Sequence, residues 1–283
     1  MEITETFPPT PASANAKPIA SEPDPNNPHW GVWIGLGVWM LSVAAIVIFP
    51  ALFLLPYLAM SGINFSAGVD LGAFATTDRT AIILQVAAII PAHLFTLGVA
   101  WFVVTRLRRY PFFRSLGWDF AGVRWWHYIL MIAVILIAVL AAVNIFQFKE
   151  DDLDRIIRSS RTALYLVAIM AVFTAPLVEE VVYRGVLFAP IYRRFGTVAS
   201  VIAVTALFAA VHVPQYAANP GKIVLLTGLS LLLTLLRAGT GSLLPCVILH
   251  TLFNGLNSLL LIAEPAIKPY LPQPVPGFFT LLQ

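Results

Sequence analysis

Charged residues are scarce in this sequence. Only 11% of its 283 residues are Asp, Glu, Lys or Arg, whereas 59% are hydrophobic. Ordinary soluble domains have about 25% charged and about 45–50% apolar residues, so this composition excludes them. The net charge of +3 is too small to favour a nucleic-acid partner. The sequence therefore predicts an integral membrane protein whose surroundings are the lipid bilayer.

Cysteine is almost absent, because the chain has only Cys246. A single cysteine excludes a disulfide within the chain and a metal site built from several thiolates. Cys246 lies in an apolar segment, where we expect it to be a small packing residue.

Long hydrophobic runs are missing from the first 28 residues, which are rich in proline. This composition predicts a disordered N-terminal tail over residues 1–28. A secretory signal would need a basic segment followed by an apolar one at the very start, and neither is present. We expect the first membrane-spanning helix to act as the insertion signal instead.

The rest of the chain contains long apolar runs. Each is close to the roughly 20 residues that a helix needs to cross the hydrocarbon core of a bilayer. They predict an all-α, polytopic membrane helix bundle of about seven transmembrane helices, with eight as the alternative. The predicted spans are Gly31–Leu58, Ala81–Thr105, Trp126–Phe148, Thr162–Ile191, Thr197–Val213, Ile223–Leu236 and Ser242–Ile262. Residues 29–161 then hold the N-terminal helices, residues 162–262 a second helix bundle and residues 263–283 a C-terminal tail.

Arginine residues gather at three of the turns between these spans. The loop after the second span holds five arginines, the turn after the fourth holds Arg193 and Arg194, and Arg237 follows the sixth. If the helices alternate in direction, all three turns lie on one side, which the positive-inside rule makes cytoplasmic. The loop Lys149–Arg161 carries four acidic and four basic residues and lies opposite. We therefore expect the N-terminus inside and the C-terminus outside.

A few polar residues interrupt the apolar runs between Val178 and Asn254. Each charge near the bilayer centre costs about 2.5–3.5 kcal/mol on insertion scales, so such residues normally pair, line a wet cavity or do chemistry. At a rise of 1.5 Å per residue, Glu179 and His212 lie about 20 and 24 Å from the arginine-bearing ends of their helices. On the same count, His250 and Asn254 lie about 14 and 20 Å from theirs. Three helices are thus predicted to bring polar side chains to a similar depth.

The first polar group contains two adjacent glutamates. Glu180 and Arg184 are four residues apart, so they share a helix face and can form a structural ion pair. Glu179 points roughly 100° away from Glu180 and lacks an obvious local partner. The spacing therefore assigns different surroundings to the two carboxylates.

The remaining polar residues could complete a site for hydrolysis. A water between Glu179 and His212 could be deprotonated to attack a carbonyl. His250 and Asn254 could then donate hydrogen bonds to the developing oxyanion. Alternatively, Glu179, His212 and His250 could form the His₂Glu ligand set of a catalytic zinc centre. No His-Glu-x-x-His motif supports zinc separately, so either no cofactor or a single divalent metal remains possible.

Three short motifs contain these residues. Glu179-Glu180-Val-Val-Tyr-Arg184 matches E-E-x-x-x-R, Phe208-Ala-Ala-Val-His212 matches F-x-x-x-H, and His250-Thr-Leu-Phe-Asn254 matches H-x-x-x-N. In this order and on separate membrane helices they resemble the CPBP family of intramembrane proteases. That family includes the type II CAAX prenyl endopeptidases (Rce1-like) and the bacteriocin-processing or self-immunity proteins, also called Abi proteins. The resemblance covers about Thr162–Ile262, just over a third of the chain.

The resemblance implies a CAAX-type intramembrane endopeptidase that is glutamate- or metal-dependent, with residues 162–262 as its catalytic bundle. It implies water activation by Glu179 and His212, an oxyanion hole from His250 and Asn254, and supporting roles for Glu180 and Arg184. The implied substrate is a peptide or protein cleaved near its C-terminus or near the membrane. The implied location is a bacterial cell membrane, with the active site open to the cytoplasm.

Two other classes of function share some of these features. A non-catalytic membrane partner, such as an immunity protein, could keep the same fold. A secondary transporter or proton relay also places charges near the membrane midplane. A transporter would be expected to show an internal repeat, and the sequence shows none, because the motif residues occur only in the fourth, fifth and seventh predicted spans.

Overall fold

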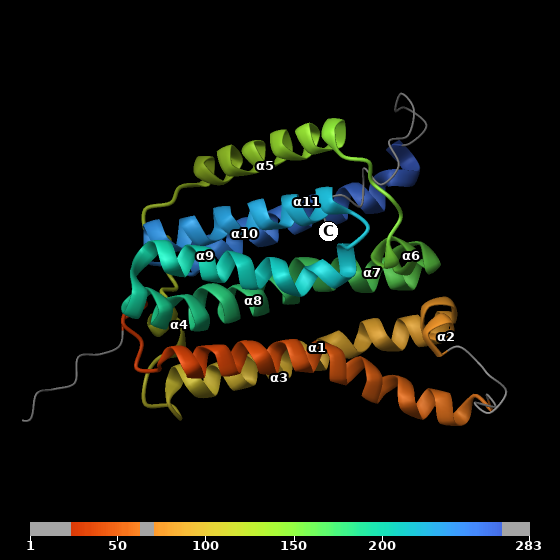
Figure 1. The fold of residues 1–283 in the computed structure, drawn as a ribbon, viewed down its shortest axis with the longest axis horizontal. Helices are drawn as coiled ribbons and strands as arrows, with labels where there is room; N and C mark the ends of the chain where they lie inside the picture. The colour runs from red at the N-terminus through yellow and green to blue at the C-terminus, as the bar shows by residue number, and fades with distance from the viewer. Residues whose placement is uncertain (1–23, 63–70, 268–283) are drawn as a thin grey trace, which may run out of the picture.

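The long elements of this chain are helices, as the composition predicts. The computed structural model describes residues 24–62 and 71–267 (Figure 1). Within these residues, six helices are long and apolar enough to cross a membrane, which indicates an integral multi-pass membrane protein. They are α1 (Val32–Met60), α3 (Arg79–Thr105), α5 (Trp125–Ile145), the continuous run Arg161–Tyr216, α10 (Pro220–Thr240) and α11 (Leu244–Ile267).

The run Arg161–Tyr216 contains two of the predicted spans, so the structure gives six candidates where the sequence predicts seven. It consists of α7 (Arg161–Ile169), a π-helical turn η2 (Met170–Thr174), α8 (Ala175–Glu180), a second π-helical turn η3 (Val181–Leu187) and α9 (Phe188–Tyr216). Within α9, Gly196 has φ 80° and ψ −178°, a backbone conformation that glycine adopts at little cost. Figure 1 shows the chain running to one end of the bundle before this residue and back after it.

Three short helices that the sequence pattern did not predict join the long ones: α2 (Leu71–Thr77), α4 (Phe112–Leu116) and α6 (Asp152–Ser159). α6 lies in the loop of mixed charge before α7. The carboxylates of Asp151 and Asp154 cap its first turn by accepting each other's backbone N–H, at 3.1 and 3.0 Å. Lys222 of α10 places its Nζ 2.6 Å from Asp151 Oδ2, and all three side chains are buried. This loop is therefore anchored inside the protein by an ion pair.

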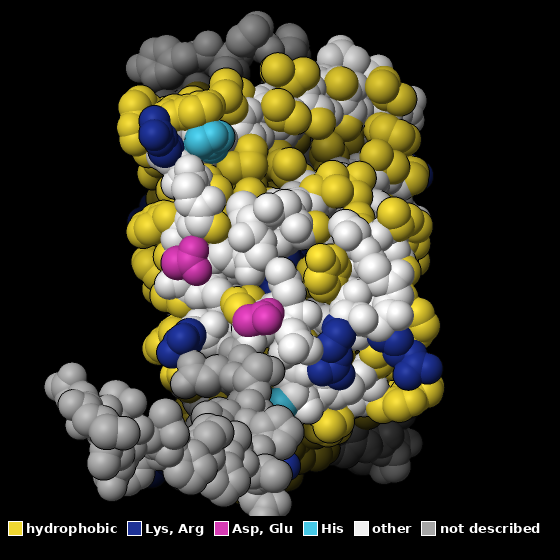
Figure 2. All heavy atoms as spheres, turned by 90° about the vertical axis from the view of Figure 1, so that its left-hand side faces the viewer, with side chains coloured by type: hydrophobic (Ala, Val, Ile, Leu, Met, Phe, Trp, Pro, Cys, Tyr) yellow, Lys and Arg dark blue, Asp and Glu magenta, His cyan; other side chains and the backbone are white. Residues whose placement is uncertain are grey.

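The arginine-bearing turns lie near one another, because Arg193 and Arg237 both bind residues 25–30 and Tyr110 of the loop after α3 stacks on His29. Figure 2 shows Lys and Arg side chains exposed on the end of the bundle that lies at the left of Figure 1. There Arg193 donates hydrogen bonds to the carbonyls of Pro28 and Trp30. Arg237 donates to Asn26 Oδ1 at 2.8 Å and to the carbonyl of Pro25 at 2.6 Å. The end of the predicted tail, residues 24–28, is thus bound to two arginines. Residues 1–23 of that tail lie outside the described residues, as do residues 268–283, and α11 continues to Ile267.

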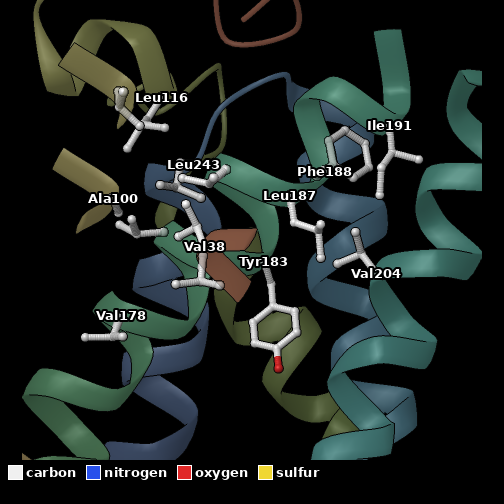
Figure 3. Close-up of a cluster of buried hydrophobic side chains, with 14 of the residues drawn as sticks. Val38, Ala100, Leu116, Val178, Tyr183, Leu187, Phe188, Ile191, Val204 and Leu243 are labelled. Carbon is white, nitrogen blue, oxygen red and sulfur yellow. The ribbon is translucent and has the colours of Figure 1, made fainter. Parts of the chain in front are cut away.

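The largest cluster of buried hydrophobic side chains joins the N-terminal helices to the run Arg161–Tyr216 (Figure 3). Val38 of α1 and Ala100 of α3 meet Leu187 of η3 in this cluster. α1 can approach closely because a Cβ at Gly35 would lie only 3.1 Å from the carbonyl oxygen of Val186. Since lipid tails are as apolar as these side chains, close packing rather than removal from water stabilises such contacts in a membrane. The helix that carries the two glutamates is therefore held by α1 and α3.

Candidate active site

Both adjacent glutamates lie in α8, a short α-helical segment between two π-helical turns. The N–H of Ala175 bonds the carbonyl of Met170, five residues back, and the N–H of Phe188 does the same with Tyr183. Pro176 has no N–H and so cannot continue the α-helical hydrogen bonding at the end of η2. π-helical turns within α-helices occur frequently at functional sites.

Glu180 and Arg184 form the ion pair that their spacing predicts. Arg184 Nη1 lies 3.0 Å from Glu180 Oε1, and both side chains are fully buried. Two residues of α10, Ser230 and Thr234, complete the surroundings of the guanidinium. Arg184 Nη2 donates to the Ser230 hydroxyl at 2.7 Å and to its carbonyl at 3.0 Å, and Nε donates to the Thr234 hydroxyl at 3.2 Å. The only sequence signal for these partners is two hydroxyl residues four apart in an apolar helix.

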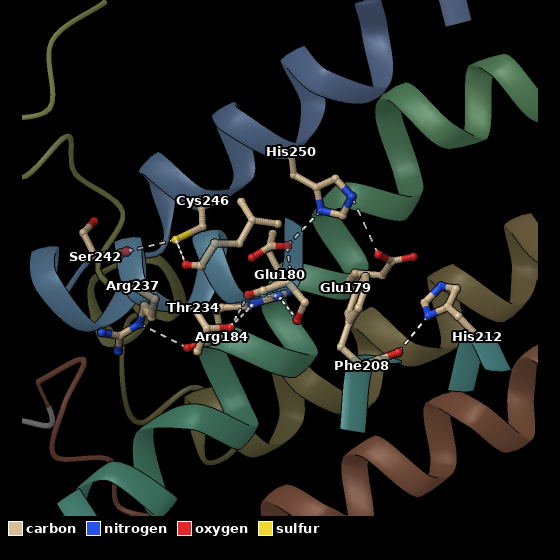
Figure 4. A network of polar contacts seen from close by, with 12 residues as sticks. Glu179, Glu180, Arg184, Phe208, His212, Thr234, Arg237, Ser242, Cys246 and His250 are labelled. Atoms are coloured by element: carbon tan, nitrogen blue, oxygen red, sulfur yellow. Dashed lines mark hydrogen bonds and ion pairs between the residues drawn. The ribbon is translucent and has the colours of Figure 1, made fainter. Parts of the chain in front are cut away.

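His250 connects the two glutamates (Figure 4). Its Nδ1 lies 2.8 Å from Glu180 Oε1, and its Nε2 lies 3.9 Å from Glu179 Oε2. α8 and α11 therefore bring these residues to the same depth, as the sequence predicts. The hydrogen bond between His250 and Glu180 was not predicted, because a helical pattern does not give the direction of a side chain relative to another helix.

The environments of the two glutamates differ sharply. The Glu180 side chain is 0% exposed, whereas the Glu179 side chain is 27% exposed. Among the described residues no hydrogen bond reaches the Glu179 carboxylate, and the nearest charged partner is His250. Glu179 is thus the carboxylate that water can approach.

His212 of α9 has one ring nitrogen committed to its own helix. Nδ1 lies 2.8 Å from the carbonyl oxygen of Phe208, which can only accept, so Nδ1 carries a proton and Nε2 is left as the acceptor of a neutral ring. The Phe208 ring packs against the imidazole, with 4.7 Å between ring centroids. In the view of Figure 4, the Glu179 carboxylate lies between His250 and His212. No direct hydrogen bond joins Glu179 to His212 in the part of the chain that the structure describes.

Asn254 of α11 faces the π-helical turn η2. Its Nδ2 donates to the carbonyl of Ala171 at 2.8 Å. A side-chain amide has two N–H groups, so this bond fixes the orientation of the amide and leaves a second donor.

The residues proposed as metal ligands do not come together as a ligand set in residues 24–62 and 71–267. In these ranges no group of three or more His, Cys, Asp or Glu side chains is arranged to hold a metal ion. As they lie in the described residues, these side chains do not fit a metal ligand set.

Two further polar groups near the site come from the N-terminal helices. Trp39 of α1 donates its indole N–H to the Tyr183 hydroxyl at 3.0 Å. His93 of α3 is buried and lies 2.9 Å from the Thr174 hydroxyl in η2. Both residues lie in ordinary apolar helices, so the sequence gives no sign that they are near the site. Only the packing of α1 and α3 against the helix that carries the glutamates shows it.

Comparison with known proteins adds one finding. Residues 161–256 match the family model described as Rce1-like, type II CAAX prenyl endopeptidase. No curated protein and no solved structure matches the chain. The matched residues contain all three motifs, whereas α1, α3 and α5 precede them. Residues 161–256 are therefore an Rce1-like domain of the type II CAAX prenyl endopeptidase family.

Proposed function

We propose that this protein is an intramembrane endopeptidase that uses a water activated by Glu179 and His212. The observation that supports this most directly is the position of His250, which bonds the buried Glu180 through Nδ1 and turns Nε2 toward the accessible Glu179. The three motifs thus contribute side chains around one carboxylate that water can reach.

Charge balance supports a protonated His250. Glu179 and Glu180 supply two negative charges, and Arg184 supplies one positive charge. A protonated His250 supplies the second, so the four groups together are neutral. Because unpaired charges are costly in a buried site, this neutral combination is favoured. His250 then donates through Nδ1 to Glu180 and presents a second N–H at Nε2.

Water activation follows from the neutral form of His212, in which Nδ1 carries the ring proton. Its Nε2 is an acceptor, so Glu179 and His212 can both accept hydrogen bonds from one water between them. Glu179 takes a proton as the water oxygen forms a bond to the carbonyl carbon of the substrate. The same proton then passes to the leaving nitrogen as the C–N bond breaks. The first products are a carboxylic acid and an amine, and transfer of the acid proton to the amine gives a carboxylate and an ammonium group.

The developing oxyanion needs hydrogen-bond donors. The Nε2–H of His250 and the second N–H of Asn254 can supply them, and the bond to Ala171 holds the amide in place. One such donor commonly contributes about 2.7–4 kcal/mol to the stability of the transition state.

The substrate is a protein or peptide cleaved near its C-terminus or near the membrane. Support comes from the family domain and from the arginine-bearing end, which we assign to the cytoplasm by the positive-inside rule. Seven crossings fit this assignment, because the run Arg161–Tyr216 reverses direction at Gly196. The N-terminus is then inside and the C-terminus outside.

Proteolysis by purified protein tests the proposal. The protein in detergent or nanodiscs is incubated with a peptide library, and new termini are identified by mass spectrometry. Glu179→Ala and His212→Ala should abolish cleavage while the protein stays inserted and folded, because each removes one partner of the water. Glu264→Ala, a glutamate near the end of α11 that lies 3.8 Å from Arg158, is the matched control and should cleave normally. Full activity of Glu179→Ala or His212→Ala would contradict the proposed mechanism.

A further inference from the structure

Tyr183 brings a hydroxyl to the site that the proposed mechanism does not use. We propose that this hydroxyl positions the Glu179 carboxylate when substrate binds, and that Trp39 of α1 sets its direction. This inference rests on the proposed function, and it assigns a role to a helix that precedes the matched family domain.

The first support is placement along the helix. Tyr183 follows Glu179 by four residues, so both side chains lie on the same face, just as Glu180 and Arg184 do. In Figure 3 the Tyr183 hydroxyl points away from the labelled hydrophobic side chains beside it.

The second support is a matching pair of unmet hydrogen bonds. The Tyr183 oxygen accepts the Trp39 N–H, which leaves the phenolic proton to be donated. Among the described residues no acceptor for this proton is present, although the side chain is only 5% exposed. Buried tyrosine hydroxyls usually find a partner. The carboxylate of Glu179 likewise receives no hydrogen bond from the described residues. The Tyr183 hydroxyl can therefore act as the donor and the Glu179 carboxylate as the acceptor.

A direct bond between these groups is not formed here. Catalytic hydrogen bonds are often long without substrate and tighten in the substrate complex. In that complex the Tyr183 hydroxyl would hold one carboxylate oxygen of Glu179, and the other oxygen would face the water.

The third support is rigidity around Tyr183. Its ring packs edge-on against Phe208 with 5.1 Å between centroids, and Phe208 in turn accepts the hydrogen bond of His212. Trp30, two residues before α1, donates its indole N–H to the carbonyl of Val186 in η3 at 2.9 Å and so ties the start of α1 to η3. The donor on α1 and the acceptor in η3 are therefore held in register.

The experiment uses the full chain and measures kcat and KM on a peptide that the wild type cleaves. Tyr183→Phe removes only the hydroxyl and keeps the ring on Phe208. We expect kcat to fall about ten- to hundredfold, with KM nearly unchanged, because a hydrogen bond to a charged group is lost in the transition state. Trp39→Phe should lower kcat by a smaller factor. In the Tyr183→Phe background, Trp39→Phe should have no further effect on kcat, because it acts through the hydroxyl.

Tyr128→Phe is the matched control, since its hydroxyl is also buried and has no hydrogen-bond partner within the described residues. Its kcat should equal that of the wild type. A wild-type kcat for Tyr183→Phe, or additive effects of the two variants on kcat, would overturn this inference and leave the proteolytic function intact. If the wild type cleaves no peptide and Glu179→Ala behaves identically, the proposed function itself fails.

Discussion

The buried pair of Glu180 and Arg184 gives the sharpest prediction about stability. Both side chains are fully buried, and their charged atoms lie 3.0 Å apart. Glu180→Gln removes the negative charge and leaves Arg184 uncompensated, whereas Arg184→Leu does the reverse. Removing one partner of a buried pair commonly costs about 3–5 kcal/mol of folding free energy. Glu180→Gln should be the more harmful change, because Glu180 also accepts the hydrogen bond from His250.

The double variant, Glu180→Gln with Arg184→Leu, tests whether the two residues stabilise the protein as one ion pair or through two independent sets of contacts. If the two losses were independent, the double variant would lose about 6–10 kcal/mol, the sum of the single costs. Each single change leaves a buried charge that the double change removes, so we expect a loss smaller than the sum by at least about 2 kcal/mol. The hydroxyls of Ser230 and Thr234 lose the guanidinium in this variant, but Thr234 keeps its own bond to the carbonyl of Ser230 at 2.7 Å.

Unfolding of the four proteins in identical lipid nanodiscs measures these differences, with denaturant midpoints followed by tryptophan fluorescence. Asp152 and Arg155 are the control, because their charged atoms also lie 3.0 Å apart but their side chains are 63% and 57% exposed. Replacing either should change stability by about 0–1 kcal/mol, as is usual for exposed pairs. Additive losses for Glu180→Gln and Arg184→Leu, or losses no larger than those of the control, would refute the structural role of the pair.

Three further predictions concern catalysis, topology and metal. His250→Ala and Asn254→Ala should each lower kcat by roughly 10²–10³-fold and raise KM by a smaller factor, because an oxyanion donor acts mainly in the transition state. A change confined to KM would place these residues in substrate binding instead. With Cys246 replaced, single cysteines at Arg108 and Arg194 should react with a cytoplasmic reagent, and a cysteine at Gln215 should not; the opposite pattern would invert the topology. Chelator treatment and elemental analysis should show activity without bound zinc, whereas near-stoichiometric zinc that tracks activity and is lost in His212→Ala would make Glu179, His212 and His250 ligands.

Helix positions could be predicted from the sequence because membrane spans depend on local composition. The predicted span Ala81–Thr105 corresponds to α3 (Arg79–Thr105), and Trp126–Phe148 to α5 (Trp125–Ile145). The ion pair of Glu180 and Arg184 could be predicted for the same reason, since its geometry depends only on four residues of one helix. The two helical spans on either side of Gly196 were also predicted, as Thr162–Ile191 and Thr197–Val213, although they form one continuous run in the structure.

Contacts between helices could not be predicted in the same way. The bond from His250 to Glu180 and that from Trp39 to Tyr183 depend on how each helix is rotated about its axis, which neighbouring helices decide. The burial of Asp151 depends on Lys222, which lies about seventy residues further along the chain. In the sequence alone these residues look like a solvated loop of mixed charge and an isolated lysine near a helix end. Their pairing is visible only once the structure brings Lys222 of α10 to the first turn of α6.

The two adjacent glutamates show why both kinds of information are needed. Consecutive residues on a helix point about 100° apart, so one carboxylate of the pair can be buried while the other stays accessible to water. Glu180 meets Arg184 of η3 and His250 of α11 and is 0% exposed. Glu179 remains 27% exposed, beside the second nitrogen of the same histidine. A single glutamate could not both orient His250 and accept a proton from water, because the first task places the carboxylate in a buried position beside Arg184 and His250 and the second requires an oxygen that water can reach. Two neighbouring positions of one helix therefore provide two environments that one residue could not combine: a buried one for Glu180 and a water-accessible one for Glu179.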